Sequence, residues 1–254
     1  MDALYHPHLG HDSKPTENYF YEFLLIFFAV SLGFLAESLR EGYVDKLKAN
    51  VFAQSLYDDL KADTAAIQKT HKEKAWIVAK YDSAGNILAS ADLYKNYEFI
   101  YYAERYLGYN DAFSSQDVTW QQLQNSESTK YIKNINLYKK IAKYYNIYKQ
   151  YESVDDQFGY SQKSNNLMAI EAKLFNLHDL KSLNNYNSTD FYNLIKRPDY
   201  ELKPIRRDVE YLKLLYLNFD NSKQRENNAM ILLGSLKVKA TDIMKDLKEE
   251  YKLK

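Results

Sequence analysis

Residues 23–36 read FLLIFFAVSLGFLA, and no other stretch of this polar chain resembles them. The run is apolar on every face except at Ser31, whereas a helix packed on a small domain normally keeps a polar stripe. Its 14 residues, lying between Glu22 and Glu37, cover about 21 Å at 1.5 Å per residue, less than a hydrocarbon core of roughly 30 Å. Taken alone, the run is too short to span a bilayer.

The residues that flank the run lengthen it. Aromatic residues 19–21 extend its first edge, and Leu39 continues it on the other side. Aromatic side chains favour the membrane interface, and Glu22 and Glu37 are placed to lie at the two interfaces. We therefore predict a transmembrane helix at residues 19–39, which makes the lipid bilayer the first expected partner.

Two other interpretations of the run are a core helix of a soluble helical oligomer and a cleaved signal peptide. A signal peptide fits poorly, because residues 1–18 contain one basic residue, Lys14, and no positive n-region. The orientation of the helix stays open. Basic residues after it at Arg40, Lys46 and Lys48 favour a cytoplasmic C-terminal domain, whereas a single N-terminal anchor commonly exports the domain on its C-terminal side.

Composition limits what the rest of the chain does. Lys plus Arg and Asp plus Glu number 34 each over 254 residues, so no overall field recruits nucleic acid, and no specific nucleic-acid partner is expected. The chain has no Cys, which excludes disulfides, thiolate nucleophiles and iron–sulfur ligation. Only 7 Gly and 4 Pro are present, which favours long helices over a turn-rich β architecture.

The predicted fold class is all-α: an N-terminal transmembrane helix continues into a helical bundle with long antiparallel helices. Residues 1–18 form a polar tail that we expect to be disordered, and residues 40–254 form an α-helical domain. No Gly or Pro occurs between Gly42 and Gly85, which predicts one long helix or two nearly collinear ones.

Further helices are predicted after that one. One is capped by Asn136, and another runs over 156–175. The C-terminal third has helical spacing at Val209, Leu212, Tyr216 and Phe219, and then near-heptad spacing at Leu232, Leu236, Ala240, Ile243, Leu247 and Tyr251. This last series predicts an antiparallel partner for the helix that leaves the membrane.

Chemical groupings are sparse. His6, His8 and His11 have metal-ligand spacing but lie in the tail, which cannot preorganise a site, so no metal or cofactor is assigned. An acidic cluster occurs at Asp58, Asp59 and Asp63, with His71 and Glu73 beyond it. Asp59 and Asp63 share a helix face and would suit acid–base chemistry, but their alternation with Lys61 is more typical of a solvated face. No catalytic residue is assigned.

Two other groups are candidates for interactions. Basic and aromatic residues interleave on one predicted helix, a pattern that suits an anionic surface. These residues are Lys130, Lys133, Tyr138, Lys139, Lys140, Lys143 and Tyr145. The alternative, which we prefer, is a bundle helix with a Tyr face in the core and snorkelling lysines. Within the apolar run, Ala29 and Gly33 form a small-xxx-small pair that would allow helix packing and a homodimer.

Two segments carry a resemblance. Residues 22–37, EFLLIFFAVSLGFLAE, and then residues 55–64, SLYDDLKADT, resemble a group of uncharacterised single-pass inner-membrane proteins of Bacteroidetes-type bacteria. The group's pattern is an EFLxxFxAVxxGFxAE anchor and a SLxxDLKxDT helix. Residues 119–126, TWQQLQNS, with the later segments 132–134 and 144–145, are similar to its short motif, although Glu127 stands where the group often has Gly. The resemblance implies an inner-membrane location and a helical soluble domain, and no activity.

The sequence therefore favours a membrane-anchored helical interaction or sensory module that is not an enzyme. Its expected partner is a protein or small ligand bound by the bundle. An accessory subunit of a larger membrane complex is the nearest alternative. A carboxylate-dependent enzyme using Asp59 and Asp63, and a fully soluble helical oligomer, are the others.

Overall fold

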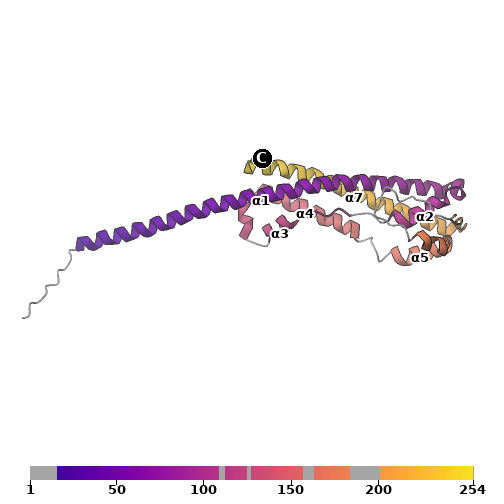
Figure 1. Cartoon of the computed structure of the whole chain (residues 1–254), viewed down its shortest axis with the longest axis horizontal. Helices are drawn as coiled ribbons and strands as arrows, with labels where there is room; N and C mark the ends of the chain where they lie inside the picture. The colour runs from indigo at the N-terminus through magenta and orange to yellow at the C-terminus, as the bar shows by residue number, and fades with distance from the viewer. Residues whose placement is uncertain (1–15, 109–111, 125–126, 157–162, 184–200, 254) are drawn as a thin grey trace, which may run out of the picture. The chain divides into compact units, whose positions relative to one another are not determined.

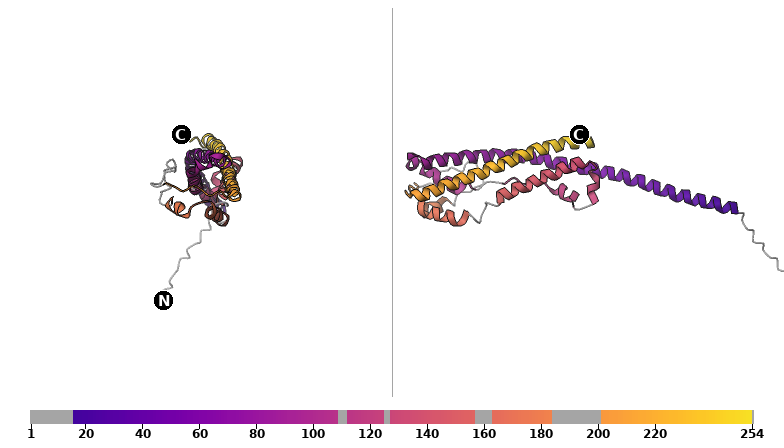
Figure 2. Two further views of the ribbon diagram at one scale, coloured as in Figure 1. Left: turned by 90° about the vertical axis from the view of Figure 1, so that its right-hand side faces the viewer. Right: turned by 180° about the vertical axis from the view of Figure 1, so that it is seen from behind.

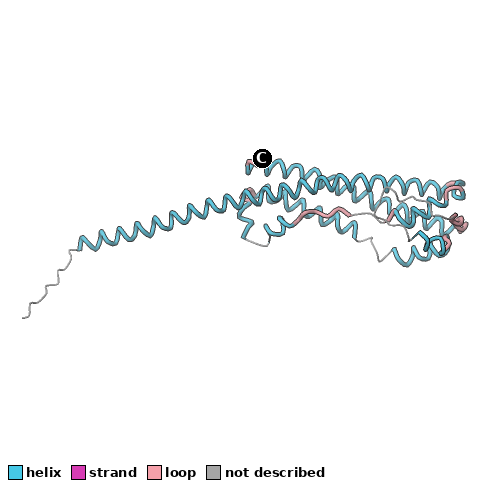
Figure 3. Tube along the Cα trace, viewed as in Figure 1, coloured by secondary structure: helices cyan, strands magenta, loops and turns pink. Residues whose placement is uncertain are grey.

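The computed structural model describes residues 16–108, 112–124, 127–156, 163–183 and 201–253. Throughout these ranges the regular elements are helices, and no strand occurs among them (Figure 3). The α-helices are α1 (Thr16–Ala89), α2 (Tyr97–Tyr106), α3 (Val118–Gln124), α4 (Ile135–Asp156), α5 (Lys163–Leu174), α6 (Leu177–Leu183) and α7 (Val209–Tyr251). Short 3₁₀ helices cover Ala91–Tyr94 and Glu127–Tyr131. The predicted all-α bundle is confirmed.

The chain divides into two compact units, residues 1–51 and residues 52–254. In the first unit, α1 begins at Thr16, before the predicted start at residue 19, and exposes apolar side chains on every side. Phe23 is 61% exposed, Leu25 72% and Phe34 74%. None of the most apolar 18-residue window is buried, and this helix is long and apolar enough to cross a membrane.

The second unit is built around three helices: α1 from Phe52 onward, α4 and α7 (Figure 1). Early residues of α1 meet late residues of α7. The Nζ of Lys248 lies 5.2 Å from the ring centroid of Tyr57, and the rings of Tyr81 and Phe219 lie 5.7 Å apart. These two helices are therefore antiparallel, as the sequence predicts. Figure 2 shows the same arrangement from behind, with α7 in yellow along α1.

Helix α4 also runs antiparallel to α7, and both meet α1 in one core. Asn134 Nδ2, just before α4, donates to Glu250 Oε2 at 2.8 Å, and Lys140 Nζ lies 2.9 Å from Asp242 Oδ2. The order of these pairs fixes the direction, because the contact on α7 moves back along the chain as α4 advances. The core of this half contains Leu56, Leu60, Leu137, Ile141, Leu236 and Ile243.

The buried positions that form the seam on α1 and α7 alternate by three and four residues. Glu73, which is also buried, lies outside this series. On α1 the seam positions are Ala53, Leu56, Leu60, Asp63, Ile67, Thr70, Lys74, Ile77, Tyr81 and Ala84. On α7 they are Leu215, Phe219, Ser222, Glu226, Ala229, Leu233, Leu236, Ala240, Ile243 and Leu247. This spacing is the heptad pattern of a coiled-coil seam. Its polar members interrupt it on both helices.

The interruptions separate two apolar cores. One core joins α1, α4 and α7 around Leu60 and Leu236, and the other joins α1, α2, α5, α6 and α7 around Ile77 and Phe219. Between them, the buried seam positions Thr70 and Lys74 of α1 and Ser222 and Glu226 of α7 are polar or charged. A polar layer therefore crosses the middle of the bundle.

Some predicted helix boundaries and faces were wrong. Asn134, and not Asn136, caps α4, because its Oδ1 accepts hydrogen bonds from the N–H groups of Asn136 (3.0 Å) and Leu137 (3.2 Å). In place of one helix over 156–175, α4 ends at Asp156 and α5 begins at Lys163.

The first predicted face of α7 is also wrong in part. Phe219 is buried, but Val209 is 66% exposed and Tyr216 is 43% exposed. The core position in that turn belongs to Leu215, which is fully buried.

The seam gives a direct test with a matched pair on one helix. Leu233 is fully buried and Ile231, two residues earlier, is 69% exposed. Leu233→Ala should lower the free energy of unfolding by about 2–5 kcal/mol, because it leaves a cavity in the core. Ile231→Ala should change it by less than about 0.5 kcal/mol. Urea titration of the full-length protein in nonionic micelles measures both, and equal effects would contradict the assigned seam.

Candidate functional site

A buried carboxylate ties together three segments of the first core. Asp63 on α1 is 1% exposed. Its Oδ2 accepts hydrogen bonds from Ser115 Oγ at 2.5 Å and Tyr144 Oη at 2.6 Å, and its Oδ1 accepts one from the N–H of Gln116 at 2.8 Å. The 112–117 loop and α4 are thereby fastened to α1.

Burial of Asp63 overturns the expectation that the acidic cluster is a solvated face. Burial raises the pKa of this carboxyl group, although the hydrogen bonds from Ser115, Tyr144 and Gln116 favour its charged form. Asp58 does lie on the exposed side, where its Oδ2 accepts from Gln54. The sequence signal was available, because Asp63 stands three residues after Leu60 and four before Ile67, in the seam.

The other members of the acidic cluster do not form a shared site with Asp63. His71 is exposed, and Glu73 is buried with its Oε1 3.7 Å from Lys69 Nζ. Burial and the nearby charge of Asp63 both raise the pKa of Tyr145. The three groups that donate hydrogen bonds to Asp63 all belong to the folded chain itself. The arrangement therefore stabilises the fold.

The polar layer contains a second buried carboxylate, with two cations beside it. Lys74 Nζ lies 2.8 Å from Glu226 Oε2, and both side chains are almost completely buried. Arg225 donates to Glu226 Oε1 from Nε at 3.3 Å and from Nη2 at 2.9 Å. Neither Lys74, Arg225 nor Glu226 was singled out in the sequence, although the heptad spacing places Lys74 and Glu226 in the seam.

Lys74 and Arg225 determine the protonation state of Glu226. Burial alone would raise its pKa, but the charges of Lys74 and Arg225 outweigh burial and hold the pKa below its usual value of 4.5. A carboxyl group with a lowered folded-state pKa stabilises the fold above its unfolded pKa, and this stabilisation is lost as the pH falls through the folded pKa. Near neutral pH, Glu226 is therefore an anion inside the bundle.

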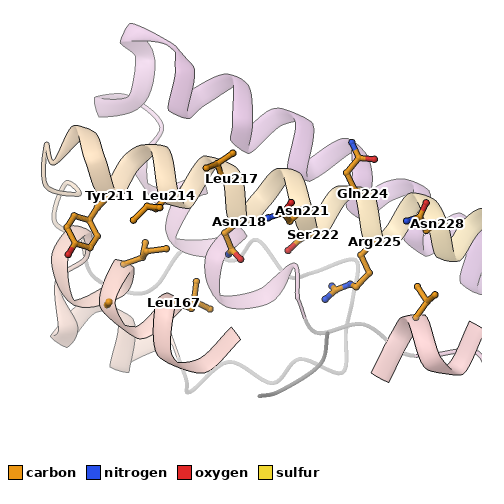
Figure 4. Close-up of a pocket in the computed structure, with 13 residues that line it drawn as sticks. Leu167, Tyr211, Leu214, Leu217, Asn218, Asn221, Ser222, Gln224, Arg225 and Asn228 are labelled. Atoms are coloured by element: carbon orange, nitrogen blue, oxygen red, sulfur yellow. The ribbon is translucent and has the colours of Figure 1, made fainter. Parts of the chain in front are cut away.

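A cavity of about 880 Å³ opens onto this layer (Figure 4). Arg225 and Asn218 extend from α7 on the side where Leu167 of α5 lies. Among the residues that the structure describes, the polar lining comes from α7: Asn218, Asn221, Ser222, Gln224, Arg225 and Asn228. The apolar lining comes from α4, α5 and α7: Val154, Leu167, Ala169, Ile170, Tyr211, Leu214 and Leu217.

This cavity has the composition of a small-molecule binding site. Its volume lies within the range of ligand pockets, and apolar walls face a row of hydrogen-bonding groups. The amide side chains of Asn and Gln both donate and accept hydrogen bonds. A guanidinium carries five N–H groups, and Arg225 uses only Nε and Nη2 toward Glu226. A polar ligand with an apolar portion would fit here in contact with Arg225, which in turn bonds to Glu226.

Contrary to the expectation from the sequence, the predicted Lys and Tyr surface does not lie on one helix. Lys130 is in the 3₁₀ helix Glu127–Tyr131, Lys133 is in the loop that follows, and the other members are on α4. Tyr145 is 2% exposed and stacks on Trp120 at 5.3 Å, so its assignment to an interaction surface was wrong. Tyr138 is partly buried against the same core. The bundle-helix interpretation accounts for these tyrosines, because period 3.6 brings them to one side.

The lysines of this group remain at the surface, and they differ in their contacts. Lys133, Lys139 and Lys143 are exposed. Lys130 Nζ lies 5.4 Å from the ring centroid of Tyr131. Lys140 bonds to Asp246 at 2.6 Å and Asp242 at 2.9 Å, and these hydrogen bonds raise its pKa. It therefore serves the α4–α7 contact.

The remaining sequence candidates are not brought into a site. Ala29 and Gly33 are exposed, and a Cβ added at Gly33 would meet nothing within 4 Å, so helix packing there stays a prediction. His6, His8 and His11 lie outside the described residues. Within the described ranges, no three His, Asp or Glu side chains gather as metal ligands.

Substitutions at Asp63 separate its hydrogen-bonding role from its charge. Asp63→Ala removes the acceptor of three buried donors and should cost about 2–5 kcal/mol of unfolding free energy. Asp63→Asn should cost less than half as much, because its carbonyl still accepts from Gln116 and the two hydroxyl groups can turn to accept from its amide. Urea unfolding of the full-length variants tests this. Equal losses would show that the donors require a carboxylate.

Substitutions at the ion pair test whether its charges depend on each other. Lys74→Met should cost about 3–5 kcal/mol at pH 7, because Glu226 loses its main counter-charge inside the bundle. The double variant Lys74→Met with Glu226→Leu should recover most of this loss, since apolar pairs replace buried ion pairs well.

The loss caused by Lys74→Met alone should shrink as the pH falls, because Glu226 without the charge of Lys74 is still buried and takes up a proton more readily than in the unmodified chain. Unfolding midpoints at pH 7 and pH 3.5 measure the difference. A double variant no more stable than the single one, or a loss independent of pH, would contradict the described pair.

Compared with known protein families, curated proteins and solved structures, the chain matches none of them. Its function is therefore inferred from the contacts, burial and charges of its own residues.

Proposed function

We propose that the chain is a membrane-anchored helical interaction or sensory module that is not an enzyme. Residues 19–39 cross the inner membrane once, and the helical domain binds a small polar ligand or a partner protein. The observation that carries the anchor is that no residue in the most apolar window of α1 is buried. Large apolar side chains exposed all around a helix require a partner surface, and lipid supplies one.

The C-terminal edge of the run supports the same placement. Arg40 pairs with Glu37 at 2.6 Å, and both side chains are more than half exposed. A charged pair directly after an apolar helix suits the headgroup region, where water and lipid phosphates solvate it. Acidic Glu22 stands at the opposite edge. With aromatic residues 19–21 before it and Leu39 after it, the apolar segment between these charges reaches the length of a single membrane span.

The binding role rests on the cavity along α7. Its polar wall includes Arg225, which contacts Glu226, and Glu226 contacts Lys74 on α1. Helix α1 is also the helix that carries residues 19–39. A ligand that competes for Arg225 would alter a buried charge pair held by the membrane-anchored helix, which is the kind of local electrostatic change that switches use.

The alternatives give different observations. An accessory subunit of a larger membrane complex would share the anchor and bind a protein in place of a small ligand. A carboxylate enzyme would need Asp59 and Asp63 in a concave site, but neither lines either of the two cavities described for this chain. A soluble helical oligomer would cover residues 19–39 with other copies of the chain and leave membranes on washing.

The anchor is tested by alkaline carbonate extraction of membranes from cells that express the full-length chain. The protein should stay in the pellet. Ile26→Arg with Val30→Arg should release it, because each arginine near the middle of a span costs about 2.5–3.5 kcal/mol of insertion free energy. Val51→Arg is the control, since Val51 is 65% exposed but outside the run. Recovery of the unmodified chain in the supernatant would refute the anchor.

Deleting residues 1–41 should leave a soluble, strongly helical product, because the second compact unit begins at Phe52. Circular dichroism of that product gives the helical content. A largely disordered product would contradict the separation of anchor and bundle.

A further inference from the structure

A second cavity lies where α1 ends and α7 begins. Its volume is about 760 Å³. The described walls come from the last turn of α1, the 3₁₀ helix after it, Arg207 just before α7, and the first three turns of α7. They consist mainly of apolar side chains: Leu88, Ala89, Leu93, Val209, Leu212 and Leu217, with Tyr94 and Tyr216.

Much of this apolar lining faces solvent. Val209 is 66% exposed, Leu217 54% and Tyr216 43%. Tyr216 also closes over Gly85, where an added Cβ would lie 3.4 Å from its ring. Exposed apolar side chains that surround a cavity, in contrast to scattered ones, mark a place where another apolar group is bound. The occupant must therefore bring apolar surface.

Charges in the lining are of one sign. Arg207 and Lys213 are its charged members, and no Asp or Glu is among the described lining residues. The Arg207 guanidinium lies 3.9 Å from the ring centroid of Tyr94, so an aromatic face holds it in place at the cavity. The neighbouring carboxylate of Asp208 is turned to the backbone, where it accepts from the N–H of Tyr211 at 3.3 Å.

From this combination we propose that the cavity binds a single-chain amphiphile with a carboxylate head, the chemistry of a fatty acid. The alkyl chain lies among Leu88, Leu93 and Leu212, and the carboxylate pairs with Arg207 and Lys213. Arginine binds carboxylates through two parallel N–H bonds, and the ammonium of a lysine adds a point charge. An uncharged chain of the same length would fill the walls and leave both cations without a partner.

This site is independent of the polar cavity that supports the proposed function, and it does not require residues 19–39 to cross a membrane. The two cavities differ in lining, and among the described lining residues they share Leu217 alone. The larger one presents a row of amide groups, whereas this one presents apolar walls with two cations.

Photolabelling of the full-length protein in phosphatidylcholine nanodiscs tests the proposal. A diazirine derivative of palmitic acid is added, irradiated, and mapped by mass spectrometry of the digested protein. Labels should appear within residues 88–94 and 207–217. Excess palmitate should compete for these labels, whereas methyl palmitate, which lacks the charge, should compete at least about fivefold less well. The probe should also label residues 19–39 from the bilayer. These labels do not depend on either cavity, so they serve as an internal reference for the extent of labelling.

Substitutions of Arg207 and Lys213 test whether these two cations bind the carboxylate head group. Arg207→Gln with Lys213→Gln should reduce labelling of the two cavity segments at least about fivefold, while labelling of residues 19–39 stays unchanged. Lys139→Gln with Lys143→Gln, two exposed lysines on α4, is the matched control and should label like the unmodified chain. Cavity labels that persist in the first variant, equal competition by the methyl ester, or no label in either cavity segment would each overturn the proposal. Loss of the bilayer labels with retained cavity labels would refute the anchor and leave this site standing.

Discussion

The seam between α1 and α7 is the contact on which the remaining packing depends. Both helices place a side chain in it every three or four residues, from Ala53 to Ala84 on one and from Leu215 to Leu247 on the other. An apolar seam alone would tolerate a slip of one heptad. Lys74 and Glu226 exclude such a slip, because it would leave each of these buried charges against apolar neighbours. A single ion pair thus fixes the register in which both apolar cores form.

Buried carboxylates also join separate segments of the chain elsewhere in the bundle. Asp63 accepts hydrogen bonds from Ser115 and Tyr144, and so joins α1 to the 112–117 loop and α4. Asp179 on α6 accepts from the N–H of Lys203 at 2.8 Å, in the segment that leads into α7. Each of these acids bonds to groups far away in the sequence. The 112–117 loop and α6 are thereby tied to other parts of the bundle, and at Asp63 the loss of the acceptor would leave buried donors unsatisfied.

Periodicity predicted the long elements well, and it failed where polar residues occupy core positions. The spacing of Leu236, Ala240, Ile243 and Leu247 identified the α7 face and its antiparallel partner. Asp63 was predicted to be exposed because it is charged, although the three-and-four spacing gives it a core position. Its partners Ser115 and Tyr144 lie 52 and 81 residues away in the sequence. Such partners come from tertiary contacts, which a single sequence does not reveal. The larger cavity depends in the same way on where α5 meets α7, and the smaller one on where α1 meets α7.

The N-terminal third of α7 carries exposed and buried apolar side chains in the same turns. Leu214, Tyr216 and Leu217 are 43–54% exposed, whereas Leu215 and Phe219 are buried in the second apolar core. The exposed face of this third contributes to the lining of both described cavities. A ligand that binds only the folded form of a helix segment stabilises that form. Because the same segment leads into Arg225 and Glu226, occupancy of either cavity would act on the helix that supplies one half of the register-setting ion pair.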